Sequence, residues 1–378
     1  MHSILFEKVR IGDLELKNRF LMSAAAGWKA TEEGDIMEGP VIHYKIAKGG
    51  PAMIINGGVS IHASGRLGPR SAIFNGDRRI PSFGRFAHEI HEGGAVVAFQ
   101  LTHSGLWAGP YQIKTGSTPF APSFLINDAI CNYGSTNQEE CPAAEEQILE
   151  VAGAYGDAAA RAKRAGYDAV EVHAAHDSLL SQFLSPLTNT RQDNWGGSLE
   201  NRCNLHCEIL ADIRSKVGAS FPVIMKLGVQ DGLERGLPLM EGITAAKIIA
   251  QNGNVDALEV SQGLSGSTTD FNETSIKTGI TSIEKEGYYR EWTKMAKNAV
   301  KDDVLVIMQG GLRSFELVEY VVRSGEADLV SMCRPYLRET ALINRWLGGD
   351  RTKATCISCN KCVMASIMEG KPLQCAIK

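Results

Sequence analysis

Residues 166–176 read GYDAVEVHAAH, and this stretch, together with its two flanks, indicates the fold. The run 143–165 before it has the apolar spacing of an amphipathic helix, and Gly166 stands where a glycine ends such a helix. Residues 169–175 form a continuous apolar run, which is typical of a strand buried on both faces of a parallel sheet. A second helical pattern follows over 198–217. This succession predicts a βαβ unit.

The same alternation recurs along the chain, with further helical patterns over 239–252 and 313–325. Eight apolar, β-rich runs are present: 20–25, 52–58, 95–102, 169–175, 223–228, 257–263, 304–311 and 328–333. They predict an α/β fold, a closed (β/α)8 TIM barrel over 1–348. An open doubly wound sheet is the alternative, and it is disfavoured because no G-x-G-x-x-G follows an N-terminal strand.

Composition excludes several classes of protein. The chain has 378 residues and a formal net charge of -4, which disfavours a nucleic-acid binder. It contains no apolar run long enough to cross a membrane, and its N-terminus lacks a signal-peptide pattern. We therefore expect a cytoplasmic protein with no membrane association. Oligomeric state is left open, a homo-oligomer being compatible with the sequence.

The cysteines are unevenly distributed. Without a secretory signal, disulfides are a poor explanation for nine of them. Five are scattered, whereas four crowd into the C-terminal segment 349–378, which we predict to be an appended Cys-rich metal-binding segment. These four are Cys356, Cys359, Cys362 and Cys375. Three thiolates at short spacing and a fourth further on suit either a cubane iron–sulfur cluster or tetrahedral zinc.

Active sites of such barrels lie at the carboxyl ends of the strands. Gly310 and Gly311 end the seventh run, and Cys333 and Arg334 end the eighth. Loops after these two strands commonly bind phosphate in this fold, because backbone N–H groups and a helix N-terminus meet there. The alternative is a pair of ordinary turn glycines beside a surface arginine.

Polar residues at the ends of other strands suggest a ligand with both charge and hydrogen-bonding edges. The side-chain amide of Gln100 can hydrogen-bond to both groups of an O=C–N–H edge on a ligand. Lys226 can stabilise negative charge on a reduced ring. A lysine inside a barrel that only pairs with an acid is the alternative. His173 and His176, three residues apart after a strand, can both donate to one small anion or carbonyl oxygen. The alternatives for this pair are packing roles or a zinc site.

Several motifs resemble one enzyme family. Residues 166–176, 182–186 and 189–202 strongly resemble the old yellow enzyme family of FMN-dependent oxidoreductases, and 16–19 and 100–105 fit the same family. The spacing Cys-x2-Cys-x2-Cys-x12-Cys resembles the cluster segment of the branch that contains trimethylamine dehydrogenase, 2,4-dienoyl-CoA reductase and 2-enoate reductase. In that branch four cysteines hold a 4Fe–4S cluster beside the flavin.

The resemblance implies a role for each matching residue. Gln100 and Lys226 would contact the flavin pyrimidine edge, and the His173–His176 pair would hydrogen-bond an electron-withdrawing oxygen of the substrate. The FMN phosphate would be held by Gly310, Gly311, Cys333 and Arg334. The flavin ring would be lined by Ser23, Ala24, Ala25, Ala26, Gly57 and Gly58. The 4Fe–4S cluster would be held by Cys356, Cys359, Cys362 and Cys375.

The sequence departs from the family in three ways. Ser178 stands where family ene-reductases commonly have a tyrosine proton donor, and Ala24 replaces a common proline. Tyr111, Tyr133 or solvent are the other proton sources. The chain ends at Lys378, where larger members continue with a nucleotide-binding domain. We therefore expect electrons to come from a separate carrier protein or reductase subunit.

The function predicted from these motifs is an ene-reductase-like oxidoreductase. Hydride would pass from flavin N5 to the activated C=C of a small conjugated carbonyl, carboxylate or thioester. The alternative is an oxidative dehydrogenase or demethylase of an amine, which Ser178 favours and which an aromatic cage would support. Candidates for such a cage are Trp28, Trp107, Tyr111 and Tyr133. A non-catalytic electron-transfer subunit is a third alternative, which the histidine pair disfavours.

Overall fold

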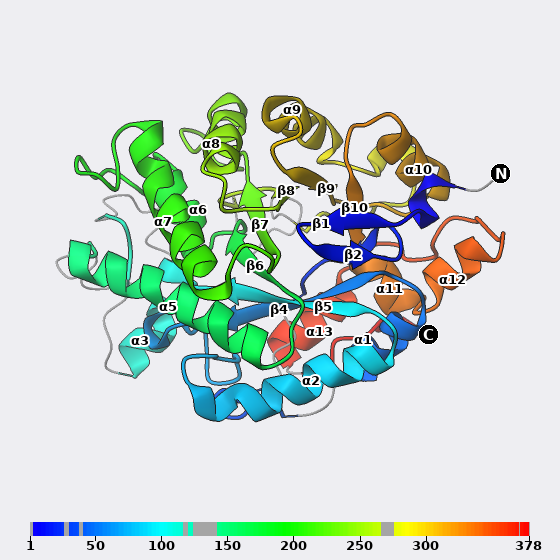
Figure 1. Cartoon of the computed structure of the whole chain (residues 1–378), viewed down its shortest axis with the longest axis horizontal. Helices are drawn as coiled ribbons and strands as arrows, with labels where there is room; N and C mark the ends of the chain where they lie inside the picture. The colour runs from blue at the N-terminus through cyan, green and yellow to red at the C-terminus, as the bar shows by residue number, and fades with distance from the viewer. Residues whose placement is uncertain are drawn as a thin grey trace.

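The computed structural model describes residues 3–25, 30–37, 41–115, 120–123, 142–265, 276–369 and 371–377. Within these ranges eight parallel strands close into a barrel in the order β10-β3-β4-β5-β6-β7-β8-β9 (Figure 1). The strands are β3 (Phe20–Met22), β4 (Met53–Ser60), β5 (Val96–Thr102), β6 (Ala169–Ala174), β7 (Val223–Gly228), β8 (Ala257–Ser261), β9 (Leu305–Met308) and β10 (Leu329–Met332). Because β10 pairs with β3, the predicted closed barrel is confirmed.

Helices follow the strands and cover the barrel (Figure 1). The longer ones are α1 (Val41–Lys48), α2 (Ile80–Glu92), α5 (Glu145–Arg164), α7 (Leu199–Val217), α8 (Leu239–Gln251), α9 (Arg290–Val300) and α10 (Phe315–Arg323). After β10 come α11 (Arg334–Arg338), α12 (Leu342–Leu347) and α13 (Lys361–Glu369). Gly166 has the positive φ expected after α5. Among the described residues, no helix has the length and apolar character that crossing a membrane requires.

Two strand ends differ from the sequence prediction by three residues. The first barrel strand was predicted to reach residue 25 but ends at Met22, and the seventh was predicted to reach residue 311 but ends at Met308. Gly310 and Gly311 have φ angles of 105° and 72°, which no extended strand allows. Both apolar runs therefore continue into loops at the carboxyl end of the barrel.

A short hairpin before the barrel was missed. Strands β1 (Val9–Ile11) and β2 (Leu14–Leu16) pair in antiparallel fashion. They are three residues long, too short for a periodic pattern to reveal. Ile11 and Leu16 are buried and share a core cluster with Leu21 and Met53 of the barrel, so the hairpin closes its amino end.

The inside of the barrel changes from apolar to polar along the strands. Its amino half is filled by side chains including Leu21, Ile55, Ala98, Ala169, Ile224, Ala257, Ile307 and Leu329. Two residues further along, side chains of the same face are polar, because alternate residues of a strand share a face. We call six of these the polar layer: Ser23, Gln100, Glu171, Lys226, Glu259 and Ser331. The polar layer is the floor of the carboxyl end, where barrels of this kind place their sites.

One buried histidine outside the site should make the stability of the folded protein depend on pH, which can be tested. His206 on α7 is fully buried, and burial lowers its pKa to about 4. Below a pH of about 6.5, the ordinary pKa of histidine, His206 is protonated in the unfolded chain but stays neutral in the folded protein. The free energy of unfolding therefore falls as the pH falls. Between pH 7 and pH 5 this group should cost the wild type about 2 kcal/mol.

The check is urea unfolding at both pH values. His206→Gln should lose about 2 kcal/mol less than the wild type between pH 7 and pH 5, whatever its baseline stability. Exposed His88 on α2 offers the matched control, since His88→Gln should keep the wild-type pH dependence. Equal pH dependence in the wild type and His206→Gln would show that His206 is charged in the folded protein.

Candidate active site

Lys226 is the centre of the polar layer. Its Nζ lies 3.0 Å from Ser23 Oγ, 3.1 Å from Glu259 Oε2 and 3.6 Å from Glu171 Oε2. Both glutamates have no exposed surface, and Lys226 is 2% exposed. Burial acts to lower the pKa of Lys226, but Glu171 and Glu259 outweigh it and raise the pKa, so the ammonium group stays charged. The lysine therefore pairs with two buried acids inside the barrel.

Gln100 is held in one orientation by its neighbours. Its Oε1 accepts the backbone N–H of Gly58 at 2.9 Å, and its Nε2 donates to Glu171 Oε2 at 2.6 Å. Gly58 has a φ of 70° at the point where the register between β4 and β5 shifts. A Cβ at the preceding Gly57 would lie 2.7 Å from the backbone nitrogen of Ala25. Glycine is thus required where β4 passes the loop after β3.

His173 and His176 lie together above the polar layer. Their ring centroids are 5.3 Å apart with an interplanar angle of 65°, and His173 Nδ1 is buried with no hydrogen-bond partner among the described residues. Burial, with the nearby Lys226 charge, lowers the pKa of His176 to about 3. Burial also lowers the pKa of His173, with contributions from His176 and Lys226. Both rings are neutral at pH 7, so each has one N–H to donate.

The loop after β8 holds His176 in place. His176 and Asp177 have φ angles of 53° and 64°, a conformation that non-glycine residues rarely adopt. Their backbone N–H groups donate to the carbonyls of Gln262 and Gly263, which stabilises this turn. The His176 Nε2 atom is 2.6 Å from Ser261 Oγ, which itself accepts a hydrogen bond from Gln309. The Ser261 proton is then available to Nε2, which leaves the His176 N–H on Nδ1.

The loops after β9 and β10 offer free backbone donors. Within the described ranges, the backbone N–H groups of Gly310, Gly311, Cys333 and Arg334 donate no hydrogen bond. Clustered free N–H groups of this kind fit an anion such as a phosphate. We call these four backbone donors the anion cradle. Added Cβ atoms on its two glycines would lie about 2.9 Å from tyrosine ring carbons, so both positions require glycine.

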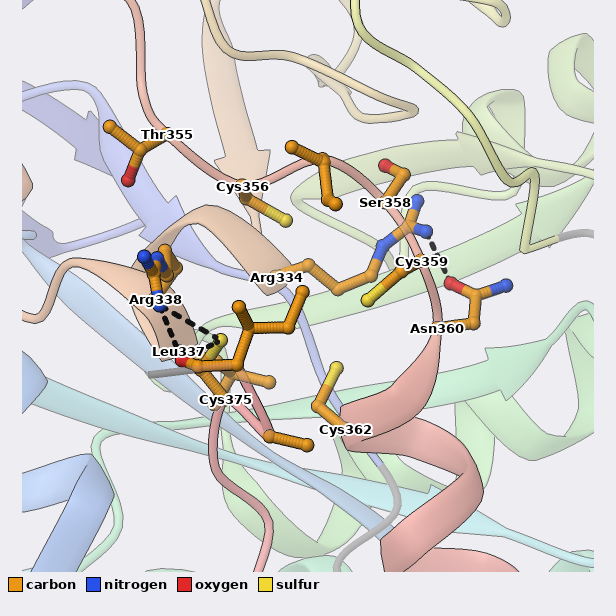
Figure 2. A pocket seen from close by; sticks show the side chains of 13 residues that line it. Arg334, Leu337, Arg338, Thr355, Cys356, Ser358, Cys359, Asn360, Cys362 and Cys375 are labelled. Atoms are coloured by element: carbon orange, nitrogen blue, oxygen red, sulfur yellow. Dashed lines mark hydrogen bonds between the residues drawn. The ribbon is translucent and has the colours of Figure 1, made fainter.

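Arg334 points from this cradle towards the C-terminal segment. Its Nη1 donates to the carbonyl of Lys277 and to Asn360 Oδ1 (Figure 2). A second arginine, Arg313, is 1% exposed and donates to the carbonyls of Gly311 and Cys356. It joins the glycine loop to the cysteine segment. Sequence analysis missed Arg313 because it follows the glycines without any distinctive spacing.

The four C-terminal cysteines line one pocket. Figure 2 shows the sulfurs of Cys356, Cys359 and Cys362 directed towards a common space, with Cys375 at its edge. All four are free thiols. Arg313 and Arg338 lie 3.7 and 3.9 Å from the sulfurs of Cys356 and Cys375. In the described part of the chain, no group of three or more His, Cys, Asp or Glu side chains is arranged to hold a metal ion.

The structure brings most of the sequence-predicted residues into two connected groups. Ser23, Gln100 and Lys226 meet in the polar layer beneath the histidine pair. The cysteines meet at their own pocket, which Arg334 also lines. Ala26, Trp28, Tyr133, Cys131 and Cys141 lie outside the described residues. Glu171 and Glu259 were missed, although an acid inside the apolar runs AVEVHAA and ALEVSQG was a visible signal.

A parallel barrel with this floor, histidine pair and anion cradle has the architecture of a flavin-dependent oxidoreductase. Residues 4–350 match the model of the NADH:flavin oxidoreductase / NADH oxidase family. The chain belongs to that family, as the resemblance to old yellow enzymes predicted.

Similar proteins cover the whole chain. It is 30% identical over 378 residues to a metal reductase of Desulforamulus reducens, covering 99% of this chain and 53% of the relative. It is also 30% identical to an NADH oxidase of Thermoanaerobacter brockii, covering 99% and 55%. The solved structure of 2-naphthoyl-CoA reductase with 2-naphthoyl-CoA matches with a TM-score of 0.85 and 26% identity, over 99% of this chain and 57% of that one. The chain thus spans about half the length of these relatives.

Proposed function

We propose that this chain binds FMN and reduces the activated C=C of a small conjugated carbonyl, carboxylate or thioester. The observation that carries the proposal is the pair of neutral histidines above the polar layer, with His173 Nδ1 buried and unpartnered. An unsatisfied buried polar atom in a site calls for a ligand that completes its hydrogen bonds. The similar fold of 2-naphthoyl-CoA reductase, solved with a CoA thioester, supports this substrate class.

The residues of the site would have separate roles in such a reaction. FMN, when bound, supplies the hydride. Gln100 and Lys226 would hold its pyrimidine edge, and the free N–H groups of Gly310, Gly311 and Cys333 would hold its phosphate. His173 and His176 would donate N–H groups to the substrate oxygen, where negative charge develops as hydride adds at the β carbon. Preorganised donors of this type stabilise an enolate in the same way as an oxyanion hole.

Ser178 does not face this site as a proton donor. It is 3% exposed, and its hydroxyl donates to the backbone carbonyl of His173 at 3.0 Å. The hydroxyl therefore supports the loop that carries the two histidines, and the proton that completes the reduction at the α carbon would come from solvent. This observation favours the second candidate function, oxidative dehydrogenation or demethylation of an amine, because that reaction needs no proton delivered to carbon.

One experiment separates the two candidates. The reduced enzyme is mixed anaerobically with a panel of enones, enoates and enoyl thioesters, and the oxidised enzyme with methylamines. Flavin reoxidation by the first panel and no bleaching by the second is the expected result. Bleaching by amines without reoxidation by any enoate would replace the main proposal with the second candidate, and neither response would refute both.

We propose further that the cysteine pocket holds a 4Fe–4S cluster, supplied with electrons by a separate carrier protein or reductase. Four soft thiolates on one pocket are the donor set of such a cluster, which spaces its ligand sulfurs more widely than a single ion does. Cys359 is exposed, so this edge of the pocket is open to a partner. Rapid reduction of the flavin by NADH or NADPH alone would remove the need for that partner.

Cysteine substitution tests the cluster directly. Wild-type protein purified anaerobically should contain about four iron and four sulfide per chain. Cys359→Ser should lose most of the iron and keep its FMN, because Cys359 is not among the residues proposed to hold FMN. Cys207→Ser on α7 is the control and should keep both. Zinc without sulfide in the wild type would make the segment a structural zinc site instead.

A further inference from the structure

Two buried carboxyl groups in the polar layer have no part in the reaction described so far. Glu171 and Glu259 are both fully buried, and the layer below them is apolar. Burying a carboxylate is costly unless it is paired and hydrogen-bonded, and an apolar barrel would be at least as stable. Lys226 alone would need one acid for neutrality, so the second acid requires its own explanation.

The contacts of the two acids are different. Glu259 Oε1 accepts hydrogen bonds from the hydroxyls of Ser23 and Ser331, and Glu259 Oε2 pairs with Lys226. Glu171 instead receives the amide of Gln100 on Oε2, the nearer of its oxygens to Lys226. Glu259 therefore neutralises the lysine, whereas Glu171 lies between the lysine and the glutamine that face the proposed flavin edge.

Glu171 also determines which edge Gln100 presents. A glutamine amide can turn over, exchanging its oxygen and nitrogen. Here the Gly58 N–H requires an oxygen on one side and Glu171 Oε2 requires a nitrogen on the other, so the amide is fixed. One N–H and one lone pair remain free, a donor and an acceptor side by side. That edge is complementary to the C=O and N–H of a flavin pyrimidine ring.

The protonation of Glu171 sets the net charge under this edge. Glu171 Oε1 has no hydrogen-bond partner and Glu259 Oε2 has only its ion pair with Lys226, so a proton on Glu171 would be shared with Glu259 and would satisfy both carboxyl groups. Burial, opposed by Lys226 and reinforced by Glu259, raises the pKa of Glu171 well above its ordinary value. With Glu171 protonated, Lys226 and Glu259 cancel and the layer is neutral. Ionisation of Glu171 would add a negative charge where a reduced flavin becomes negative.

We propose that Glu171 is a positioning residue that fixes the Gln100 amide and keeps the polar layer neutral, and thereby sets the affinity and reduction potential of the flavin. The inference rests on the FMN site proposed above, but not on the substrate. The titratable groups that act on Glu171 are Lys226 on β7 and Glu259 on β8, and the groups that act on Lys226 in turn are His173, His176 and Cys333. Among the described contacts of these groups, it is the Glu171 carboxyl that accepts the Gln100 amide.

The test compares Glu171→Leu and Glu171→Gln with the wild type. FMN dissociation constants are measured by fluorescence quenching of the apoprotein, and midpoint potentials by reduction against a reference dye across pH. Glu171→Leu should bind FMN at least tenfold more weakly, because the Gln100 amide is released. Glu171→Gln, whose amide oxygen can accept from Gln100, should restore the affinity to within threefold. It should also lack the fall in potential that the wild type shows as Glu171 ionises at high pH.

The possible results distinguish failure of this inference about Glu171 from failure of the proposed FMN site. If the wild type binds no FMN, the proposed function fails before any variant is made. If the wild type binds FMN and both variants match its affinity and its potential at every pH, Glu171 is only structural and the inference is overturned. Should Glu171→Leu fail to fold, the pH dependence of the potential of Glu171→Gln decides alone.

Discussion

The variant His173→Ala/His176→Ala should lose turnover with any enoate substrate by at least about 10²–10³-fold while it keeps its flavin. The reason is the position of the two rings at the end of β6, where they are neutral, adjacent and not needed for the polar layer below them. Removing both donors leaves the developing negative charge on the substrate oxygen with no partner. FMN binding depends on other residues and should change little.

Steady-state reduction and an absorbance spectrum of the purified variant check this together. Ser178→Ala is the matched control, because Ser178 lies on the same loop and its hydroxyl faces the His173 carbonyl instead of the site. It should keep turnover within about threefold, since one neutral hydrogen bond contributes only about 1 kcal/mol. Unchanged turnover in the double variant, with flavin bound, would refute the proposed site. A large loss in Ser178→Ala would show that the serine acts directly.

The second large effect is on stability. Lys226→Met should destabilise the protein by about 3–5 kcal/mol, because it leaves buried charge inside the barrel without its partner. Glu259 would have only Ser23 and Ser331 to balance a negative charge with no exposed surface. The same variant should weaken FMN binding, since it removes the cation from the proposed flavin edge.

Urea unfolding at pH 7 measures this loss of stability, and two further variants serve as comparisons. Lys226→Met/Glu259→Gln should recover much of the lost stability, because it also removes the carboxylate that Lys226→Met alone leaves buried without a cation. Lys297→Met removes a lysine that pairs with Asp328 at 2.9 Å at the edge of the barrel. As a partly exposed pair, it should cost no more than about 1 kcal/mol. A loss for Lys226→Met no greater than for Lys297→Met would show that the glutamates are neutral without the lysine.

Much of the barrel could be predicted because its signals are local. Apolar runs like the one around Val170 and Val172 occur eight times, with helical patterns between several of them, and that count with this alternation leaves few folds. The strand ends were less accurate. Ser23 and Gly310 belong to runs as apolar as the strands, yet lie in loops. The N-terminal hairpin was missed because three-residue strands carry no period.

The candidate site was only partly predictable. Gln100, Lys226, His173 and His176 were found because each is a polar residue at the end of a predicted strand, where barrels place their sites. Glu171 and Glu259 were equally visible as acids inside apolar runs, but their partners were not. Nothing in the spacing of Gln100, Glu171 and Lys226 shows that they share one hydrogen-bonded group.

The barrel, the likeness to old yellow enzymes and the residue types at the strand ends follow from patterns along the chain. Periodicity and motif spacing are properties of neighbouring residues, so the amino-acid order shows them directly. Which groups share protons and charge depends on the folded arrangement. Closing the barrel brings Glu171, Lys226 and Glu259 from three strands, and Ser23 from the loop after β3, within hydrogen-bonding or ion-pairing distance of one another, and excludes water from them. Charge states in that layer depend on burial and on partners distant in sequence, which no local pattern encodes.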